Sequence, residues 1–302
     1  MDISWNPIEY CGRTAISNAT KELTKFQQLE ISVKYSQEVY ERVMEVFSLN
    51  GIELGLYYCD IDDISAIEVA KILPHLTQLQ QLYLHNTQIG DTGTTAIASS
   101  ISNLTQLQGL YLGGYQIGHI GATAIANSMA NLNQLRQLSL HTNQIGDIGA
   151  TAIANSMANL AQLLQLRMDN NCIGYIGASA IANSLTSLTQ LQELNLHCNL
   201  FGDSGTTAIA NSIKDLTQLQ QLSLHNNQIG DIGATALANF ITNLTQLQWL
   251  YLNDNQIGDI GANAIANSIK NLTKLSFLSL YSNNFSEPVY QQLKQQLGHK
   301  LL

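Results

Sequence analysis

The sequence predicts an α/β solenoid, in which a short strand and a helix alternate in every repeat and all repeats stack into one domain. Three observations predict it. A 28-residue unit recurs seven times without an insertion between residues 76 and 271. Each unit contains a short run with strand periodicity and then a longer run with helical periodicity. Charged residues are concentrated outside these units, as the more polar ends of a stacked repeat array require.

The strand of each unit is predicted by the pattern LxxLxL. In the first regular unit, LTQLQQLYLHNTQIGDTGTTAIASSISN at 76–103, Leu82 and Leu84 face inward, because alternate residues of a strand point to opposite sides. The helix is predicted by segments such as GDIGATAIANSI, whose apolar residues recur at helical spacing. A single unit cannot cover its own apolar face, so the stacking of units forms the core.

The same phase continues on the N-terminal side of the regular units. Residues 48–75 form a degenerate unit, since Leu54 precedes Leu82 by 28 residues. Residues 1–47 form an N-terminal cap and a further degenerate repeat, with a strand expected at 23–31.

The C-terminal cap is predicted at residues 272–302. A last strand at its beginning is followed by an amphipathic helix, with Ser286 as a candidate N-cap. Ten strands are therefore expected in a single domain that spans residues 1–302.

Two polar columns accompany the leucines. An acidic residue between two glycines suits a turn that leads into a helix N-terminus; it recurs at Asp91, Asp147, Asp203, Asp231 and Asp259. An amide that can satisfy buried backbone groups of adjacent turns recurs at Asn143, Asn171, Asn199, Asn227, Asn255 and Asn283. The unit with Tyr115 and His119 departs most from both columns.

Taken together, the pattern LxxLxLxxNxIGDxGAxAIAxSL resembles the 28-residue repeat of ribonuclease-inhibitor-type leucine-rich-repeat proteins over about residues 15–300. The resemblance implies a curved horseshoe, with a parallel sheet of about ten strands on the concave face and helices on the convex face. It also implies protein binding. Such proteins include ribonuclease inhibitor, the activator of the small GTPase Ran, sensor regions of intracellular immune receptors and effectors of intracellular bacteria, and the fold alone selects none of them.

The composition argues against several functions. Only 12% of the residues are charged, the net charge is −9, and 28 Asn and 28 Gln supply much of the polarity. Without a cluster of Lys and Arg, nucleic-acid binding is not expected. Four cysteines without paired spacing predict neither a disulfide framework nor a structural zinc site.

No targeting or membrane segment is evident. No apolar run reaches the ~18 residues typical of a membrane span, and the first residues lack the pattern of a signal peptide. We therefore expect a monomer without a cofactor and without a membrane partner. Its expected location is the cytoplasm, or the cytosol of a host cell if the protein is a bacterial effector.

The outward positions of the strands define the expected partner-binding face. Aromatic residues, which are enriched in interface hot spots, gather at its two ends. The denser group is Trp249, Tyr251, Phe277 and Tyr281, and the other group is Tyr83 and Tyr111. Arg167 and His197 complete the predicted partner-binding set. The alternative for the denser group is packing against the C-terminal cap.

One outward column presents His141, Asp169, His197 and His225 on four successive strands. Because neighbouring strands lie ~4.8 Å apart, the first three can share a zinc ion. A straight row is nevertheless a poor tetrahedral cage, so no metal site is expected. Cys172 and Cys198 are expected to be ordinary thiols.

No catalytic motif is visible: GxSxG, the Walker loop and HExxH are all missing from the sequence. We therefore expect a non-enzymatic scaffold that binds a protein on its concave face and on the rim of strand-to-helix loops. The alternatives are a regulator of a small GTPase that resembles the Ran activator, a bacterial effector that acts on a host protein, and a solenoid without a specific partner.

Overall fold

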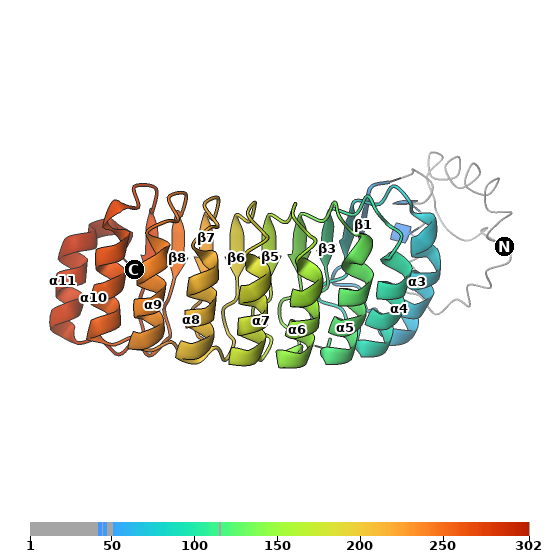
Figure 1. Ribbon diagram of the computed structural model, residues 1–302. Coiled ribbons are helices and arrows are strands. Elements are labelled where there is room, and N and C mark those ends of the chain that lie inside the picture. Colours follow the sequence, from blue (N-terminus) through green and yellow to red (C-terminus); the bar gives the residue numbers. More distant parts are fainter. Residues whose placement is uncertain (1–41, 44, 47–50, 115, 302) are drawn as a thin grey trace, which may run out of the picture.

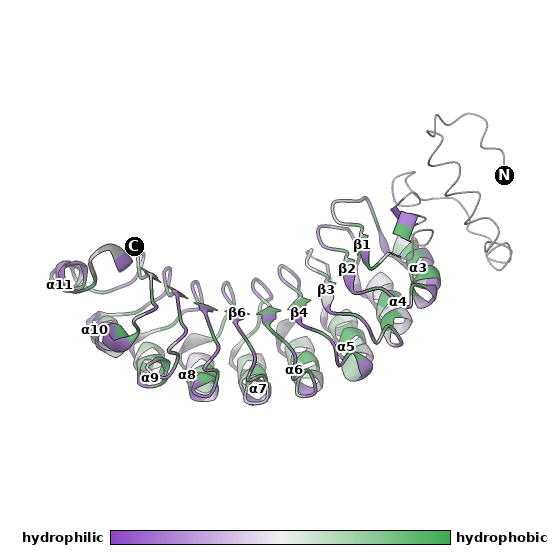
Figure 2. Ribbon diagram, turned by 90° about the horizontal axis from the view of Figure 1, so that it is seen from above, coloured by the Kyte–Doolittle hydropathy of each residue, from purple (hydrophilic) through white to green (hydrophobic). Residues whose placement is uncertain are grey.

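The computed structural model describes residues 42–43, 45–46, 51–114 and 116–301. Within this part of the chain, nine strands form one parallel sheet, and the strand order follows the sequence from β1 to β9 (Figure 1). Seen from above, the stack is curved, with the strands on the concave side and the helices on the convex side (Figure 2). The predicted fold class is confirmed. The strand expected at 23–31 and the side chain of Tyr115 lie outside the described residues.

Each strand is three residues long and consists of an outward, an inward and an outward position. The strands are β1 Glu53–Gly55, β2 Gln81–Tyr83, β3 Gly109–Tyr111, β4 Gln137–Ser139, β5 Gln165–Arg167, β6 Glu193–Asn195, β7 Gln221–Ser223, β8 Trp249–Tyr251 and β9 Phe277–Ser279.

A helix follows each of these strands, and helices of neighbouring units pack against one another. The helices are α3 Asp63–Ile72, α4 Asp91–Ile101, α5 His119–Ser128, α6 Gly146–Met157, α7 Tyr175–Leu185, α8 Gly202–Ile213, α9 Asp231–Ile241, α10 Asp259–Ser268 and α11 Glu287–Leu297. Short 3-10 helices occur at η2 Leu73–His75, η3 Met129–Asn131, η4 Ile269–Asn271 and η5 Gly298–Lys300.

The register of the sheet keeps the 28-residue period. Leu82 lies opposite Leu110, which lies opposite Leu138, and the same step recurs at every strand pair. These leucines are fully or almost fully buried and form part of one continuous core. Equivalent positions of successive units therefore become direct neighbours in space.

The asparagine column connects neighbouring units, as predicted. The Nδ2 of Asn143 donates to the carbonyls of Leu112 (2.9 Å) and Leu140 (3.0 Å). Its Oδ1 accepts from the backbone N–H of Ile117 at 3.1 Å. The buried amide thus satisfies backbone groups that the short strands leave without a ladder partner.

The aspartate column acts across units, which the sequence analysis did not foresee. The Oδ1 of Asp203 accepts from the N–H groups of Gly230 and Gly233, both at 2.8 Å, at the start of the next helix, α9. Where the column holds His119 or Tyr175, the following helix begins instead at a glycine with a positive φ, namely Gly146 or Gly202.

Ser286 is the N-cap residue of α11, as expected, but its side chain makes no capping bond to that helix. Its N–H and its hydroxyl both donate to the carboxylate of Asp259, at 2.6 and 2.9 Å. The last helix is therefore joined to the stack by the same aspartate column.

Candidate binding surface on the concave face

The concave face is built from the outward positions of the strands and from the residue two positions after each strand. Small side chains in these columns are covered by their neighbours. Ser139 occupies an outward position of β4, but it is buried because it lies between Tyr111 and Arg167 of the adjacent strands and bonds to the Nδ1 of His141 at 2.9 Å. Only the larger side chains of the columns are therefore available to a partner.

Five rings form a contiguous group at the N-terminal end, here called the N-terminal ring cluster: Tyr57, Tyr58, Tyr83, His85 and Tyr111. Tyr83 and Tyr111 stack with their ring centroids 4.4 Å apart. Tyr57 and His85 stack at 5.3 Å, and edge contacts join the two pairs. Burial lowers the pKa of His85, with a smaller contribution from the charge of Arg167.

Two glycines make room beside this cluster. A side chain at Gly109 would collide with Gln81 and with the ring of Tyr111. A side chain at Gly113 would collide with the ring of His141, which lies over that position. The ring of His141 therefore leans toward the preceding unit, into the space that Gly113 leaves open.

An ion pair network occupies the middle of the face. Asp169 is only 3% exposed. Its Oδ1 lies 3.4 Å from the Nε of Arg167, and its Oδ2 lies 3.5 Å from the Nε2 of His197. Burial lowers the pKa of His197, while the nearby Asp169 opposes that shift.

Four further rings form a chain of contacts that we call the C-terminal ring row: His197, His225, Tyr251 and Phe277. The two histidine rings stack with centroids 4.0 Å apart. Tyr251 contacts His225 at 6.2 Å and Phe277 at 5.1 Å. Burial, and then the charge of His197, lower the pKa of His225 to about 4.

The structure joins only part of the predicted C-terminal aromatic group. Tyr251 and Phe277 are in contact, whereas Trp249 and Tyr281 make no ring contact with them in the described part of the chain. Trp249 is 37% exposed and Tyr281 is 54% exposed. The N-terminal ring cluster, which extends beyond Tyr83 and Tyr111, has more ring contacts than the group predicted to be denser.

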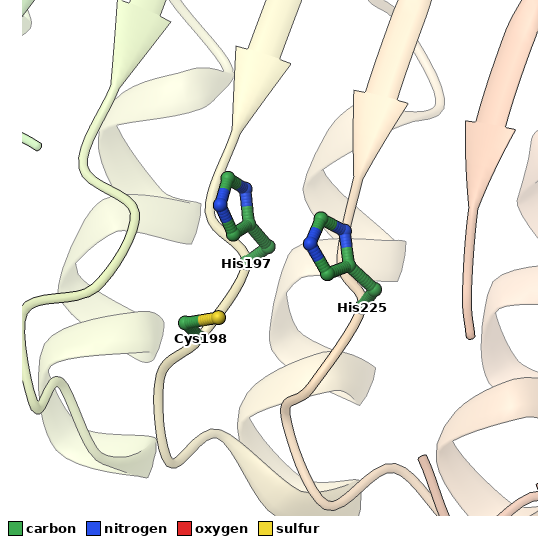
Figure 3. A group of neighbouring side chains, drawn as sticks. All are labelled: His197, Cys198 and His225. Carbon is green, nitrogen blue, oxygen red and sulfur yellow. The ribbon is translucent and has the colours of Figure 1, made fainter. Parts of the chain in front are cut away.

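The three side chains considered as zinc ligands in the outward column, from which no metal site was expected, do not come together. Asp169 approaches His197, but His141 lies over Gly113 and bonds to Ser139. Among the described residues, the group that brings three potential ligand atoms within 4.8 Å of one another is instead His197, Cys198 and His225 (Figure 3). From the sequence, Cys198 was expected to be an ordinary thiol.

A second surface feature was missed. Isoleucines in the first turn of six helices are 53–71% exposed along the strand-to-helix rim, at Ile64, Ile120, Ile148, Ile176, Ile232 and Ile260. For five of these six isoleucines, the signal was present in the recurring GxIGA segment, where the isoleucine occupies the first turn of the helix rather than facing the core.

Across the residues that the structure describes, no helix combines the length and apolarity needed to cross a lipid bilayer.

Comparisons with known proteins identify the repeat. A family model for two copies of a leucine-rich repeat matches residues 217–260, and a model for a single leucine-rich repeat matches residues 132–154 and 162–182. No curated protein sequence matches the chain.

Two solved structures of proteins from Listeria monocytogenes are similar to this chain. Internalin C2 has a TM-score of 0.50 and 20% identity, over 88% of this chain and 90% of that chain. The internalin inlF has a TM-score of 0.37 and 21% identity, over 87% of this chain and 92% of that chain. The fold of internalin C2 and the matched repeats agree with the sheet and helices described above. The protein is a solenoid of leucine-rich repeats.

Proposed function

We propose that this protein is a non-enzymatic scaffold that binds a protein partner on its concave face. The observation that carries the proposal is the presence of two groups of partly exposed rings on one continuous face. The N-terminal ring cluster lies at one end, and Trp249, Tyr251, Phe277 and Tyr281 lie at the other. Aromatic side chains lose little conformational entropy on binding and are enriched in hot spots.

The backbone beneath these rings supports the proposal. The strands follow one another at a constant 28-residue register, and the asparagine column ties each turn to the next unit. Side chains on such a scaffold are held in place before a partner arrives, so less ordering entropy is lost on association. Arg167 and His197, between the two aromatic ends, offer polar contacts to the same partner.

The rim isoleucines are a weaker candidate for specific recognition. They repeat the same residue along the stack, whereas the concave columns change from unit to unit, for example Tyr83, Ser139, Arg167 and Tyr251. A surface that discriminates between partners needs that variation. We infer that the rim contributes at most a supporting contact.

The 28-residue period, with a helix of 10–12 residues in each regular unit, also supports the ribonuclease-inhibitor type of repeat. Regulation of a small GTPase and action as a bacterial effector stay predictions, because no side chain on the concave face favours either.

Affinity capture followed by mass spectrometry tests the proposal. The wild-type chain is compared with Trp249→Ala/Tyr251→Ala, with Tyr83→Ala/Tyr111→Ala and with the rim control Ile148→Ala/Ile176→Ala, after circular dichroism has shown that each variant is folded. We expect at least one protein that the wild type and the rim control retain and a concave variant loses. If all four chains retain the same proteins, the concave face is not the binding surface.

A further inference from the structure

We propose that His197, Cys198 and His225 form a binding site for a divalent transition-metal ion of the zinc type. One ring nitrogen of each histidine and the sulfur of Cys198 lie within 4.8 Å of one another. Figure 3 shows the two imidazoles side by side beyond the ends of β6 and β7. The thiol of Cys198, the residue after His197, lies below them in this view. Two imidazoles and a thiolate are ligands that zinc accepts.

The objection that a straight row of side chains cannot surround a metal ion does not apply to this group, because its third donor is Cys198. A row of outward side chains is straight, but Cys198 is not a member of the row. Its φ of 53° interrupts the strand alternation that would otherwise turn its side chain away from that of His197. The Nδ2 of Asn226 lies 3.4 Å from the sulfur and draws it toward the unit that carries His225.

The distances are close to those of a metal centre. A tetrahedral zinc ion with ordinary bond lengths holds its nitrogen and sulfur donors ~3.3–3.6 Å apart. The three donors therefore need to approach by about 1.5 Å at most. The side chains are only partly buried, and the Nδ1 of His225 has no hydrogen-bond partner, so its ring can turn without breaking a bond at that atom.

The surroundings of His197 also favour a cation. Its Nδ1 lies 2.6 Å from the Oδ1 of Asn195 and donates a hydrogen bond to that amide oxygen. Its Nε2 lies 3.5 Å from the buried carboxylate of Asp169. The carboxylate attracts a cation bound to that nitrogen, and the Asn195 bond fixes the orientation of the ring.

Three protein ligands leave a coordination position for water or for another molecule. The site lies on the concave face, where the ring of His225 also contacts Tyr251 of the C-terminal ring row at 6.2 Å. Formation of the site requires Cys198 to release its thiol proton to solvent, because the thiolate is the form that binds a metal ion. The site does not depend on the proposed protein partner, and its test uses the metal alone.

Calorimetric titration of the full, metal-free chain with zinc chloride, in a buffer with a phosphine reductant, tests the proposal. We expect one ion per chain and at least tenfold weaker binding by His225→Ala and by Cys198→Ser. Two matched controls, His141→Ala on the same column and Cys172→Ser in the adjacent unit, should keep the wild-type affinity. Absence of stoichiometric binding by the wild type, or equal affinity in the site variants, would overturn the proposal.

Cobalt(II) provides a readout that does not depend on the fold of the histidine variant. The Cys198 thiolate should give a sulfur-to-cobalt charge-transfer absorption, which Cys198→Ser should abolish and Cys172→Ser should preserve. An absorption that disappears only with Cys172→Ser would place the ion elsewhere and refute the assignment.

Discussion

Leu138 and Leu166 lie in the middle of the inward column, each between two other leucines on the neighbouring strands. Both are almost completely buried. Truncation of either residue to alanine removes buried apolar surface and leaves a cavity that the rigid sheet cannot close. We expect a loss of roughly 2–5 kcal/mol in the free energy of unfolding, measured with urea. A loss below about 0.5 kcal/mol, which is typical of a surface position, would contradict the assignment of these leucines to the core.

His85 provides a pH-dependent contribution to stability. Burial among the tyrosine rings, followed by the charge of Arg167, lowers its pKa from the ordinary value of 6.5. In the unfolded chain the ring takes up a proton as the pH falls below about 6.5, while the folded chain resists protonation. Its contribution is therefore complete above pH 6.5 and is lost as the pH falls through the lower folded pKa.

Unfolding in urea at pH 7.5 and 5.5, with a chelator present, measures this effect. The wild type should lose stability between the two conditions, and His85→Gln should lose less, because one group that protonates preferentially in the unfolded state is gone. The control is the exposed His119, changed to Gln, which removes an imidazole that lies outside the ring cluster. If His85→Gln loses as much stability between the two pH values as the wild type does, His85 is not a source of the pH dependence.

At the scale of the elements, each helix start depends on the unit before it. Asp203 accepts two backbone N–H bonds at the start of α9, and a charged acceptor there also interacts favourably with the helix dipole. Asp203→Ala should lower the free energy of unfolding by about 1–2 kcal/mol in urea denaturation.

Tyr175→Ala is the matched control, since Tyr175 occupies the same column but the next helix starts at Gly202 with a φ of 56°. That helix needs no carboxylate from the unit before it, because the N–H of Gly202 donates to the carbonyl of Asn227 at 2.9 Å. We expect a change below about 0.5 kcal/mol. Equal losses in the two variants would show that the column does not act through the helix start.

For the whole molecule, the period made the fold predictable. Once 28 residues separate equivalent positions, strand order, register and the inward leucines follow, because each unit has to cover the apolar face of the next. The sequence alone places Leu54, Leu82 and Leu110 in one buried column. The positions of the helix starts were predictable, but the groups that accept hydrogen bonds from their first N–H groups were not. The carboxylate of Asp203 accepts these bonds from the helix of the next unit.

The face could be predicted by column but not by side-chain position. Alternation identified Ser139 and His141 as outward, yet whether an outward side chain is covered depends on the size of residues 28 positions away. His141 lies over Gly113 for that reason, and Ser139 is buried under the side chains of its neighbours. Cys198 was missed because its positive φ, and hence the direction of its side chain, has no signature in a strand pattern.

The length of the face determines how a partner can use it. β2 and β8 are separated by six strand intervals, or about 29 Å at ~4.8 Å per interval. Tyr83 and Tyr111 at one end are therefore too far from Trp249 and Tyr251 at the other to interact directly, and substitutions at the two ends should have additive effects on binding. A loss of affinity from substitutions at both ends distinguishes a partner that spans the face from one that binds at a single end.

With a partner captured, calorimetry on the two double alanine variants makes that distinction. We expect Trp249→Ala/Tyr251→Ala to weaken binding by at least about 2 kcal/mol, because Trp249 is exposed beside the Tyr251–Phe277 pair. A spanning partner should also lose affinity with Tyr83→Ala/Tyr111→Ala, and the combined variant should show the sum of the two losses. The rim control Ile148→Ala/Ile176→Ala should bind as the wild type does. Wild-type affinity in a folded Trp249→Ala/Tyr251→Ala chain would exclude the C-terminal aromatic group as the anchor and leave the N-terminal ring cluster as the surface that holds the partner.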